Sequence, residues 1–244
     1  TNTSSIPLEE IATALADPTR LIGLHFFNPV AKMMLVEIVI GARTNRDLVA
    51  PAAAFVRQID KLPLPVKSAP GFLVNRVLAP YLMAAMQAVD EGLAPETVDE
   101  AALAFGMPMG PIELADTVGL DICVAVGKLL GARGEPPRRL IELVDAGHLG
   151  RKTGRGFYAW PDGKVAKQRP GKVPPGLADR LVQPFVAEAR AALAEGIVED
   201  ADLVDAGAIF GTGFAPFRGG PLHYAGTTAA RAVQRKAEAV PVVY

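Results

Sequence analysis

The pattern of apolar residues changes character at one point in the chain, the break Pro70-Gly71. Before this break, short apolar runs alternate with stretches whose apolar residues recur at helical spacing. After it, only the helical spacing recurs, and from Phe72 to Asp90 apolar residues run nearly all round the expected helix. Strands that alternate with helices are typical of an α/β layer, whereas successive helices form an all-α unit. The chain is therefore predicted to join an α/β domain to a helical domain.

The expected elements follow this division. Strands are expected at residues 21–27, 34–40 and 64–67, the last as an edge strand because Pro65 interrupts it, with helices at 6–17 and 46–60. Further helices are expected at residues 72–90, 96–105, 117–132, 136–146, 177–196, 200–210 and 221–238, with an ordered loop at 149–160. The polar, proline-rich residues 161–176 are the best linker candidate. The expected domains are 1–69, 70–160 and 177–244.

A weak internal repeat runs through the helical part. Residues 80–92 resemble residues 184–196, and each stretch is followed in the same order by Val-Asp, Phe-Gly and Gly-Pro pairs. Self-similarity of this kind is typical of a duplicated unit whose copies pack together. The alternative is a chance likeness between two alanine-rich helices that end in glycine. The ordered landmarks favour duplication.

Composition narrows the class of protein. Of the 244 residues, 50% are hydrophobic, which excludes disorder for the bulk of the chain. Lys and Arg number 25 against 26 for Asp and Glu, so no overall basic field favours nucleic acid or an anionic membrane. Cys123 is the single cysteine, which excludes an intrachain disulfide and a cysteine-cluster metal site, and no metal is expected. A polar start and the lack of a long apolar run favour a cytoplasmic protein without a transmembrane segment.

Among the three histidines, His25 has the most informative surroundings. It lies at the end of one apolar run, and Glu37 interrupts the next, where a buried carboxylate is costly unless it is paired. If the two strands lie side by side, Glu37 returns to His25, fixes its tautomer and leaves the other ring nitrogen to accept a proton. The alternative is a core histidine bonded to backbone and an edge-strand glutamate that faces water.

Other polar residues have two interpretations each. Asn75 lies at the start of an apolar helix, where its amide needs either local backbone or a bound carbonyl or hydroxyl as a partner. Asn28 precedes a proline and is otherwise a turn residue. Asn2 and Ser4 lie in a polar segment that also suits a cap for the first helix. No GxGxxG, GxxxxGK[ST] or HExxH motif occurs, which counts against a self-contained dinucleotide-binding enzyme.

Several motifs nevertheless resemble the L-3-hydroxyacyl-CoA dehydrogenase family, with the family's spacing and over nearly the whole chain. They lie at residues 2–5 (NTSS), 23–29 (GLHFFNP), 36–37 (VE), 70–76 (PGFLVNR) and 108–116 (PMGPIELAD). Two more, at residues 150–158 (GRKTGRGFY) and 213–221 (GFAPFRGGP), are similar to the dehydrogenase part of multifunctional fatty-acid oxidation α-subunits.

The resemblance implies a fold and an activity. Residues 1–69 would be an α/β remnant, the end of a Rossmann NAD-binding domain without its glycine-rich loop, and the rest a duplicated all-α C-terminal domain. The chain would be a portion, inactive alone, of an NAD-dependent enzyme that oxidises L-3-hydroxyacyl-CoA to 3-ketoacyl-CoA in fatty-acid β-oxidation. The alternative is a non-catalytic helical domain for assembly of a multifunctional complex.

The same resemblance implies roles for single residues. His25 would be the general base and Glu37 would orient it, while Ser4 and Asn75 would bind the reacting oxygen and the acyl group. The residues on the cofactor side would be Asn2, Ser4 and Asn28. An acyl-CoA would be the substrate, NAD the cofactor, and a second copy of the chain or a thiolase β-subunit the protein partner.

Overall fold

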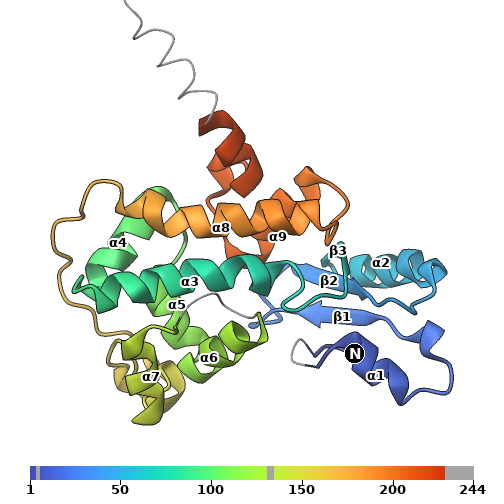
Figure 1. Cartoon of the computed structure of the whole chain (residues 1–244), viewed down its shortest axis with the longest axis horizontal. Helices are drawn as coiled ribbons and strands as arrows, with labels where there is room; N and C mark the ends of the chain where they lie inside the picture. The colour runs from blue at the N-terminus through green and yellow to red at the C-terminus, as the bar shows by residue number, and fades with distance from the viewer. Residues whose placement is uncertain (4–5, 131–134, 229–244) are drawn as a thin grey trace, which may run out of the picture.

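The chain divides into a small sheet region and a larger helical region that lie end to end (Figure 1). The computed structural model describes residues 1–3, 6–130 and 135–228. The division falls at a turn in which Gly71 and Phe72 adopt positive φ angles of 72° and 50°. The change of sequence pattern at Pro70-Gly71 therefore coincides with the end of the sheet region.

The sheet has three strands in the order β1-β2-β3. β1 (Gly23–Phe26) runs antiparallel to β2 (Leu35–Ile40), and β2 runs parallel to β3 (Leu62–Lys67). α1 (Leu8–Thr13) precedes the sheet, and α2 (Val49–Gln58) connects β2 to β3, with 3₁₀ turns at Pro18–Arg20 and Arg46–Leu48. The expected strands are confirmed, and β3 lies at an edge, as its prolines predict. α1 is shorter than the helix expected at residues 6–17.

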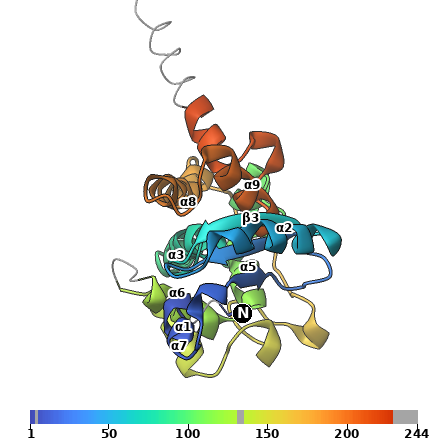
Figure 2. The same cartoon turned by 90° about the vertical axis from the view of Figure 1, so that its right-hand side faces the viewer.

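The central strand β2 is covered on both faces. Val36 and Ile38 pack with Val56 of α2 on one face. Leu35 and Glu37 alternate with them and point to the other face, where Leu35 joins the main core. On that core side lies α9 (Ala201–Thr212), which belongs to the second helical part (residues 177–228) and lies on the opposite side of the strands from α1 (Figure 2). A polar side chain on this face of β2 is therefore enclosed by the helical region.

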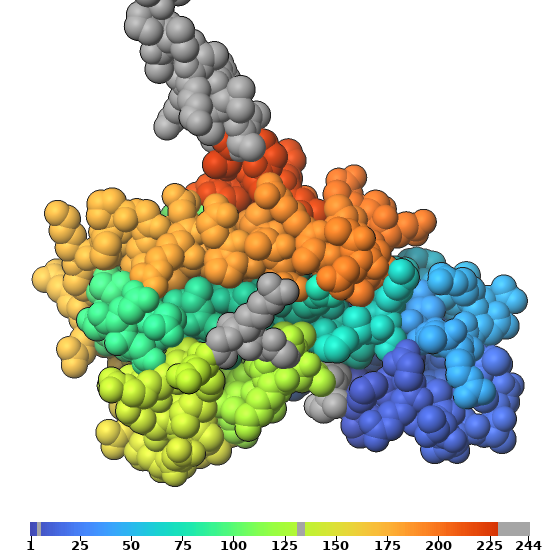
Figure 3. Space-filling view, viewed as in Figure 1, coloured from blue at the N-terminus to red at the C-terminus, as the bar shows by residue number. Residues whose placement is uncertain are grey.

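The helical region is built on two long helices that pack antiparallel. Arg76 near the start of α3 (Val74–Asp90) pairs with Glu195 just after α8 (Leu177–Ala194), and Glu91 just after α3 pairs with Arg180 in α8. Figure 3 shows the surface of α8 lying along that of α3. The helices up to α8 are α3 (Val74–Asp90), α4 (Pro95–Phe105), α5 (Pro111–Val118), α6 (Leu120–Leu129), α7 (Arg138–Asp145) and α8 (Leu177–Ala194). Residues 221–228 are also helical, whereas the rest of the helix expected at 221–238 lies outside the described residues.

One expected helix is wrong. The helix expected over residues 117–132 begins too early, because α5 ends at Val118 and α6 begins at Leu120, and α5 itself, which begins at Pro111, was not expected. Gly119 between them has φ 111° and ψ 126°, a conformation that glycine adopts readily because it has no Cβ. Helical spacing continues across the bend, so the apolar pattern did not reveal it. Residues 131–132 lie outside the described residues.

Two helices of the helical region begin in the same way. Asp99 in α4 accepts hydrogen bonds from the first backbone amides of α5, and Asp205 in α9 accepts them from the first amides of the helix at 221–228. Gly110 and Gly220 precede these helices, and a Cβ at either position would collide with the corresponding aspartate. These residues belong to the landmarks that repeat in the sequence.

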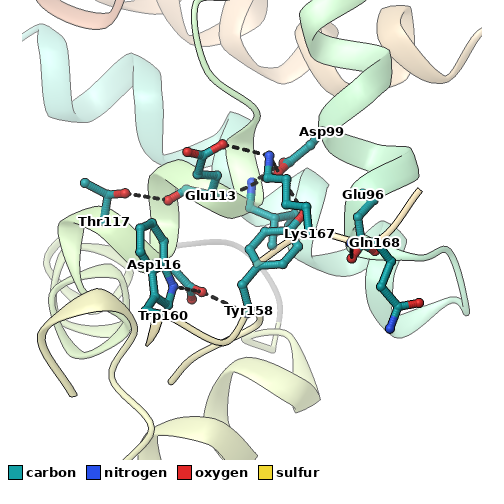
Figure 4. A network of polar contacts seen from close by, with 10 residues as sticks. Glu96, Asp99, Glu113, Asp116, Thr117, Tyr158, Trp160, Lys167 and Gln168 are labelled. Carbon is teal, nitrogen blue, oxygen red and sulfur yellow. Dashed lines mark hydrogen bonds and ion pairs between the residues drawn. The ribbon is translucent and has the colours of Figure 1, made fainter. Parts of the chain in front are cut away.

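Residues 161–176, the expected linker, lie against α4 and α5 before the chain enters α8. Lys167 Nζ is 2.8 Å from Asp99 Oδ2 and 2.7 Å from Glu113 Oε2. The Gly171 amide donates to Thr97 Oγ1 at 3.0 Å. These contacts attach the segment to α4 and α5, and Figure 4 shows those of Lys167 with Asp99 and Glu113.

Candidate active site

His25 and Glu37 face each other inside the molecule. They are direct partners in the register of β1 and β2, and Nδ1 of His25 lies 2.7 Å from Oε2 of Glu37. The exposed fraction is 7% for His25 and 0% for Glu37. The contact predicted from two neighbouring strands is therefore present, and the alternative of a water-facing glutamate is wrong.

The second oxygen of Glu37 receives the start of α3. Oε1 accepts the backbone N–H groups of Leu73 and Val74, each at 2.9 Å. α3 has no side-chain cap of its own, so a carboxylate from strand β2 takes the place of an N-cap residue. Amides in the first turn of a helix carry a partial positive charge that stabilises an anion. Their contribution offsets the cost of burying the Glu37 charge.

The turn before α3 also confines the imidazole. Phe72 adopts a left-handed backbone conformation that is unfavourable for a residue with a side chain. Its ring meets the His25 ring edge-on, with centroids 5.3 Å apart, and the Phe27 ring does the same at 4.6 Å. The two aromatic rings limit rotation of the imidazole, so that Nδ1 stays directed at Glu37.

These contacts assign the protonation pattern of the pair. An ionised carboxylate only accepts hydrogen bonds, and Glu37 already accepts two from backbone amides. Nδ1 of His25 therefore carries a proton, and Nε2 is the nitrogen left to accept one. No hydrogen bond to Nε2 is made by the residues that the structure describes. An imidazole held in this way can take a proton from a hydroxyl group while the carboxylate stabilises the resulting charge.

A cavity of about 390 Å³ lies between α3 and α6, and Gly71 and Asn75 line it. Among the described residues that line it, Asn75 and Cys123 carry the polar side-chain atoms, and the other side chains are apolar. The Asn75 side chain has no hydrogen-bond partner within the described part of the chain, so local backbone does not satisfy it. Asn75 follows directly after Val74, whose amide binds Glu37. A mostly apolar cavity with a few polar groups, one of them beside the amides that hold Glu37, is typical of a ligand site.

The other predicted site residues are distributed around the end of β1. Asn2 lies beside this strand, and its Oδ1 accepts the Phe26 amide at 2.8 Å, so the interpretation of Asn2 as a helix cap is wrong. Asn28 follows β1 and is exposed. Ser4 lies outside the described residues.

Sequence reasoning missed the groups that hold Glu37 from the start of α3. Leu73 and Val74 act through their backbone, which leaves no signal in the side chains. Arg76 was also missed: its Nε lies 2.5 Å from Oε1 of Glu188, and it pairs with Glu195 as well. The hydrogen bond to Glu195, followed by that to Glu188, raises the pKa of Arg76 although burial opposes the shift. A charge within an apolar helix start was the available signal that a partner exists.

A second cluster of buried charges has its partners within the protein (Figure 4). Burial raises the pKa of Asp99 and of Asp116, while hydrogen bonds from Lys167 to Asp99 and from Trp160 to Asp116 oppose this shift. Asp116 also accepts the backbone amide of Tyr158 at 2.9 Å. The cluster fastens the ordered loop at 149–160 to α5, which is a structural role.

The described ranges contain neither a metal-binding cluster nor a membrane-spanning helix. Within residues 1–3, 6–130 and 135–228, no group of three or more His, Cys, Asp or Glu side chains is arranged to hold a metal ion. Over the same ranges, no helix has the length and apolar character needed to cross a membrane.

Comparisons with known proteins place the chain in a family. A family model described as "3-hydroxyacyl-CoA dehydrogenase, NAD binding domain" matches residues 1–69, and one described as "3-hydroxyacyl-CoA dehydrogenase, C-terminal domain" matches residues 71–160. The chain belongs to the 3-hydroxyacyl-CoA dehydrogenase family. In this dehydrogenase-family chain, the His25–Glu37 pair lies in the NAD-binding part and the amides that hold Glu37 lie in the C-terminal part.

Curated relatives extend well beyond this 3-hydroxyacyl-CoA dehydrogenase segment. The "Fatty acid oxidation complex subunit alpha" of Shewanella baltica is 41% identical over 94% of this chain and 35% of that protein. The protein of the same name from Shewanella amazonensis is 39% identical over 97% of this chain and 36% of that protein. The chain thus spans 35% to 36% of the length of these relatives.

Solved structures of dehydrogenases are similar in fold. The 3-hydroxybutyryl-CoA dehydrogenase of Escherichia coli K12 has a TM-score of 0.77 at 28% identity, over 93% of this chain and 68% of that chain. The dehydrogenase part of multifunctional enzyme 1 from C. elegans has a TM-score of 0.62 at 31% identity, over 87% of this chain and 53% of that chain. The arrangement of sheet and helical regions is therefore shared with these dehydrogenase structures.

Proposed function

We propose that this chain supplies the proton-transferring and acyl-binding part of an NAD-dependent dehydrogenase that oxidises L-3-hydroxyacyl-CoA to 3-ketoacyl-CoA in fatty-acid β-oxidation. The observation that carries the proposal is the 2.7 Å contact between His25 Nδ1 and a Glu37 carboxylate that caps α3. Family membership supports the substrate class. A cytoplasmic location belongs to the same proposal.

The chain's own residues divide the work of the reaction. His25 accepts the proton of the substrate 3-hydroxyl at Nε2, and Glu37 stabilises the imidazolium that results. Burial strengthens this ion pair because little water screens it. Asn75 donates a hydrogen bond to the acyl group, and Ser4 binds the reacting oxygen. The apolar walls behind Asn75 suit an acyl chain.

NAD, when bound, supplies the hydride acceptor of this chemistry. Asn2 and Asn28, near the end of the strand that carries His25, line the side where the reactive ring belongs. The sequence contains no GxGxxG turn, the feature that binds a dinucleotide pyrophosphate at a helix N-terminus. The residues at hand therefore fit only the reactive end of NAD, and we expect the 244-residue chain to be inactive alone.

The test is acetoacetyl-CoA-dependent oxidation of NADH, followed by absorbance, in this chain and in the protein extended upstream to its natural start. Turnover only in the extended protein is expected, and His25→Ala there should lower kcat by at least about 10²-fold. Robust turnover by the 244-residue chain refutes its predicted inactivity. An extended protein that folds and binds NADH but shows no turnover refutes the dehydrogenase proposal.

The helical region supports a second proposal, assembly through a duplicated unit. Asp99 and Asp205 hold the starts of corresponding helices, and α3 and α8 pack antiparallel as two copies of one element would. The relatives are named as subunits of a complex. A second copy of the chain or a thiolase β-subunit is the proposed partner. Light scattering on the chain alone and mixed with that subunit tests this, and a monomeric mass in both samples refutes it.

A further inference from the structure

Two glycines of α9 lie where the second helical part meets the sheet and the start of α3. Gly207 and Gly211 are both buried and are one helical turn apart. Glycine is a poor helix former in a helix interior because it loses the most backbone freedom on folding. Its presence here therefore calls for a reason in the packing.

An added Cβ would meet different neighbours at the two glycines. A Cβ at Gly211 would lie 2.5 Å from Cγ2 and 3.0 Å from Cγ1 of Val74, and 3.0 Å from Cδ2 of Leu35. A Cβ at Gly207 would lie 2.7 Å from Cδ2 of both Leu64 and Leu73. Both positions are too close for a methyl group unless a neighbour moves.

The neighbours differ in their ability to move. Val74 is β-branched and is the first residue of α3, so one χ1 rotamer is strongly preferred and both methyl groups move with the backbone. The contacts of Gly207 are the Cδ2 atoms at the ends of the Leu64 and Leu73 side chains, which branch one carbon further from the backbone than valine and can bend aside without moving it. A methyl group at residue 211 is therefore expected to displace the Val74 backbone, whereas one at residue 207 displaces only side-chain ends.

The Val74 backbone is the point where such a shift matters. Its N–H donates to Glu37 Oε1 at 2.9 Å, and Glu37 Oε2 holds Nδ1 of His25 at 2.7 Å. We propose that Gly211 is a positioning residue for the Glu37–His25 pair. By leaving room for Val74, it lets the second helical part seat against α3 while the α3 amides reach Glu37. The consequence for catalysis rests on the proposed dehydrogenase function, whereas the consequence for the amides does not.

The first test is NMR on the ¹⁵N-labelled chain. In Gly211→Ala, the Leu73 and Val74 amide resonances should shift, and their exchange with deuterium should accelerate at least about tenfold more than that of α4 amides. Gly207→Ala should leave the Val74 resonance near its original position, and Val74 is the amide compared between these two variants because the residue-207 methyl group touches the Leu73 side chain directly. Gly226→Ala is the matched control, because this helical glycine has open space around it. Unchanged Leu73 and Val74 amides in Gly211→Ala overturn the proposal, as do equal shifts in all three variants.

A rescue variant covers the case in which Gly211→Ala does not fold. Gly211→Ala combined with Val74→Ala removes the Val74 methyl groups, which make the closest contact, so the double variant should fold and its Leu73 amide should match that of Val74→Ala alone. A double variant that stays unfolded while Val74→Ala folds, or whose Leu73 amide differs from that of Val74→Ala, overturns the proposed contact.

The second test is kinetic and uses the protein extended upstream. Gly211→Ala should lower kcat about ten- to hundredfold with little change in KM for acetoacetyl-CoA, because a small displacement of the base affects the reaction more than binding. Gly207→Ala should keep kcat near its original value. Equal losses in the two variants overturn the positioning role. If the unsubstituted extended protein is inactive, the dehydrogenase proposal fails, but the amide shifts still decide the role of Gly211.

Discussion

Glu37→Gln is the substitution whose outcome the site geometry determines most sharply. Glutamine has nearly the shape of glutamate but one oxygen and one NH₂ group. The oxygen can either accept the Leu73 and Val74 amides, as Oε1 does at 2.9 Å, or accept Nδ1–H of His25, as Oε2 does at 2.7 Å. The second orientation would leave two buried backbone N–H groups facing an NH₂ group.

The magnitude follows from counting unsatisfied donors. Each buried donor without a partner costs about 1–3 kcal/mol, so the orientation that keeps both amides bonded is favoured by about 2–6 kcal/mol. The NH₂ group then faces His25, whose Nδ1 must accept and whose Nε2 must carry the proton. The imidazole is left in the tautomer that cannot act as a base. We expect kcat of the extended protein to fall about 10²–10⁴-fold, and the free energy of unfolding to fall by only about 1–2 kcal/mol through loss of charge at the helix start.

The decisive assay is the tautomer itself. ¹⁵N spectra of the histidine-labelled chain, recorded where the rings are neutral, distinguish a protonated Nδ1 from a protonated Nε2, and three histidines keep assignment simple. Glu9→Gln is the matched control, because Glu9 also accepts a backbone amide and a side-chain hydroxyl but lies away from His25. The reasoning is refuted if His25 keeps its Nδ1 proton in Glu37→Gln, or if Glu9→Gln changes the His25 signals equally.

Three further outcomes are expected. Lys167→Met should lower the free energy of unfolding by about 2–3 kcal/mol in urea titrations, because it leaves the buried Asp99 carboxylate without its cation; a loss no larger than that for Lys172→Met would contradict this. Burial lowers the pKa of Lys167, but the bonds to Asp99 and Glu113 outweigh that effect, so the pKa lies above its ordinary value of 10.5. The stability that Lys167 contributes is therefore complete below pH 10.5 and is lost as the pH rises through the raised pKa, and Lys167→Met should not show that loss. Burial raises the pKa of the Cys123 thiol to about 12, so iodoacetamide at pH 8 should label the native chain about a thousandfold more slowly than the urea-unfolded chain; equal rates would disprove the burial.

The contact between His25 and Glu37 could be anticipated before the fold was known. The apolar runs that contain His25 and Glu37 are close in sequence, and a short connection between strands brings such residues together with few alternatives. The predicted pairing is accordingly present in the register of β1 and β2. The position of Gly119 shows the limit of the same reasoning, because a helical pattern of apolar residues continues across a bend that only the backbone reveals.

The contacts that hold the pair depended on the whole molecule. Glu37 is bonded to amides 36 and 37 residues further along the chain, and Arg76 to carboxylates 112 and 119 residues away. Backbone donors look alike in every sequence, so no motif announces which of them will meet a buried carboxylate.

The sequence alone thus determined most of the local order in this protein, with α5 and the bend at Gly119 as exceptions. The alternation of strands and helices before Pro70 and the helices after it follow from the spacing of apolar residues, which acts over a few residues at a time. Tertiary structure decided what surrounds the His25–Glu37 pair. It placed the start of α3 on Glu37, formed the cavity between α3 and α6, and packed α9 against Val74. These depend on how separate elements pack, and packing is a property of surfaces that meet only when the chain has folded.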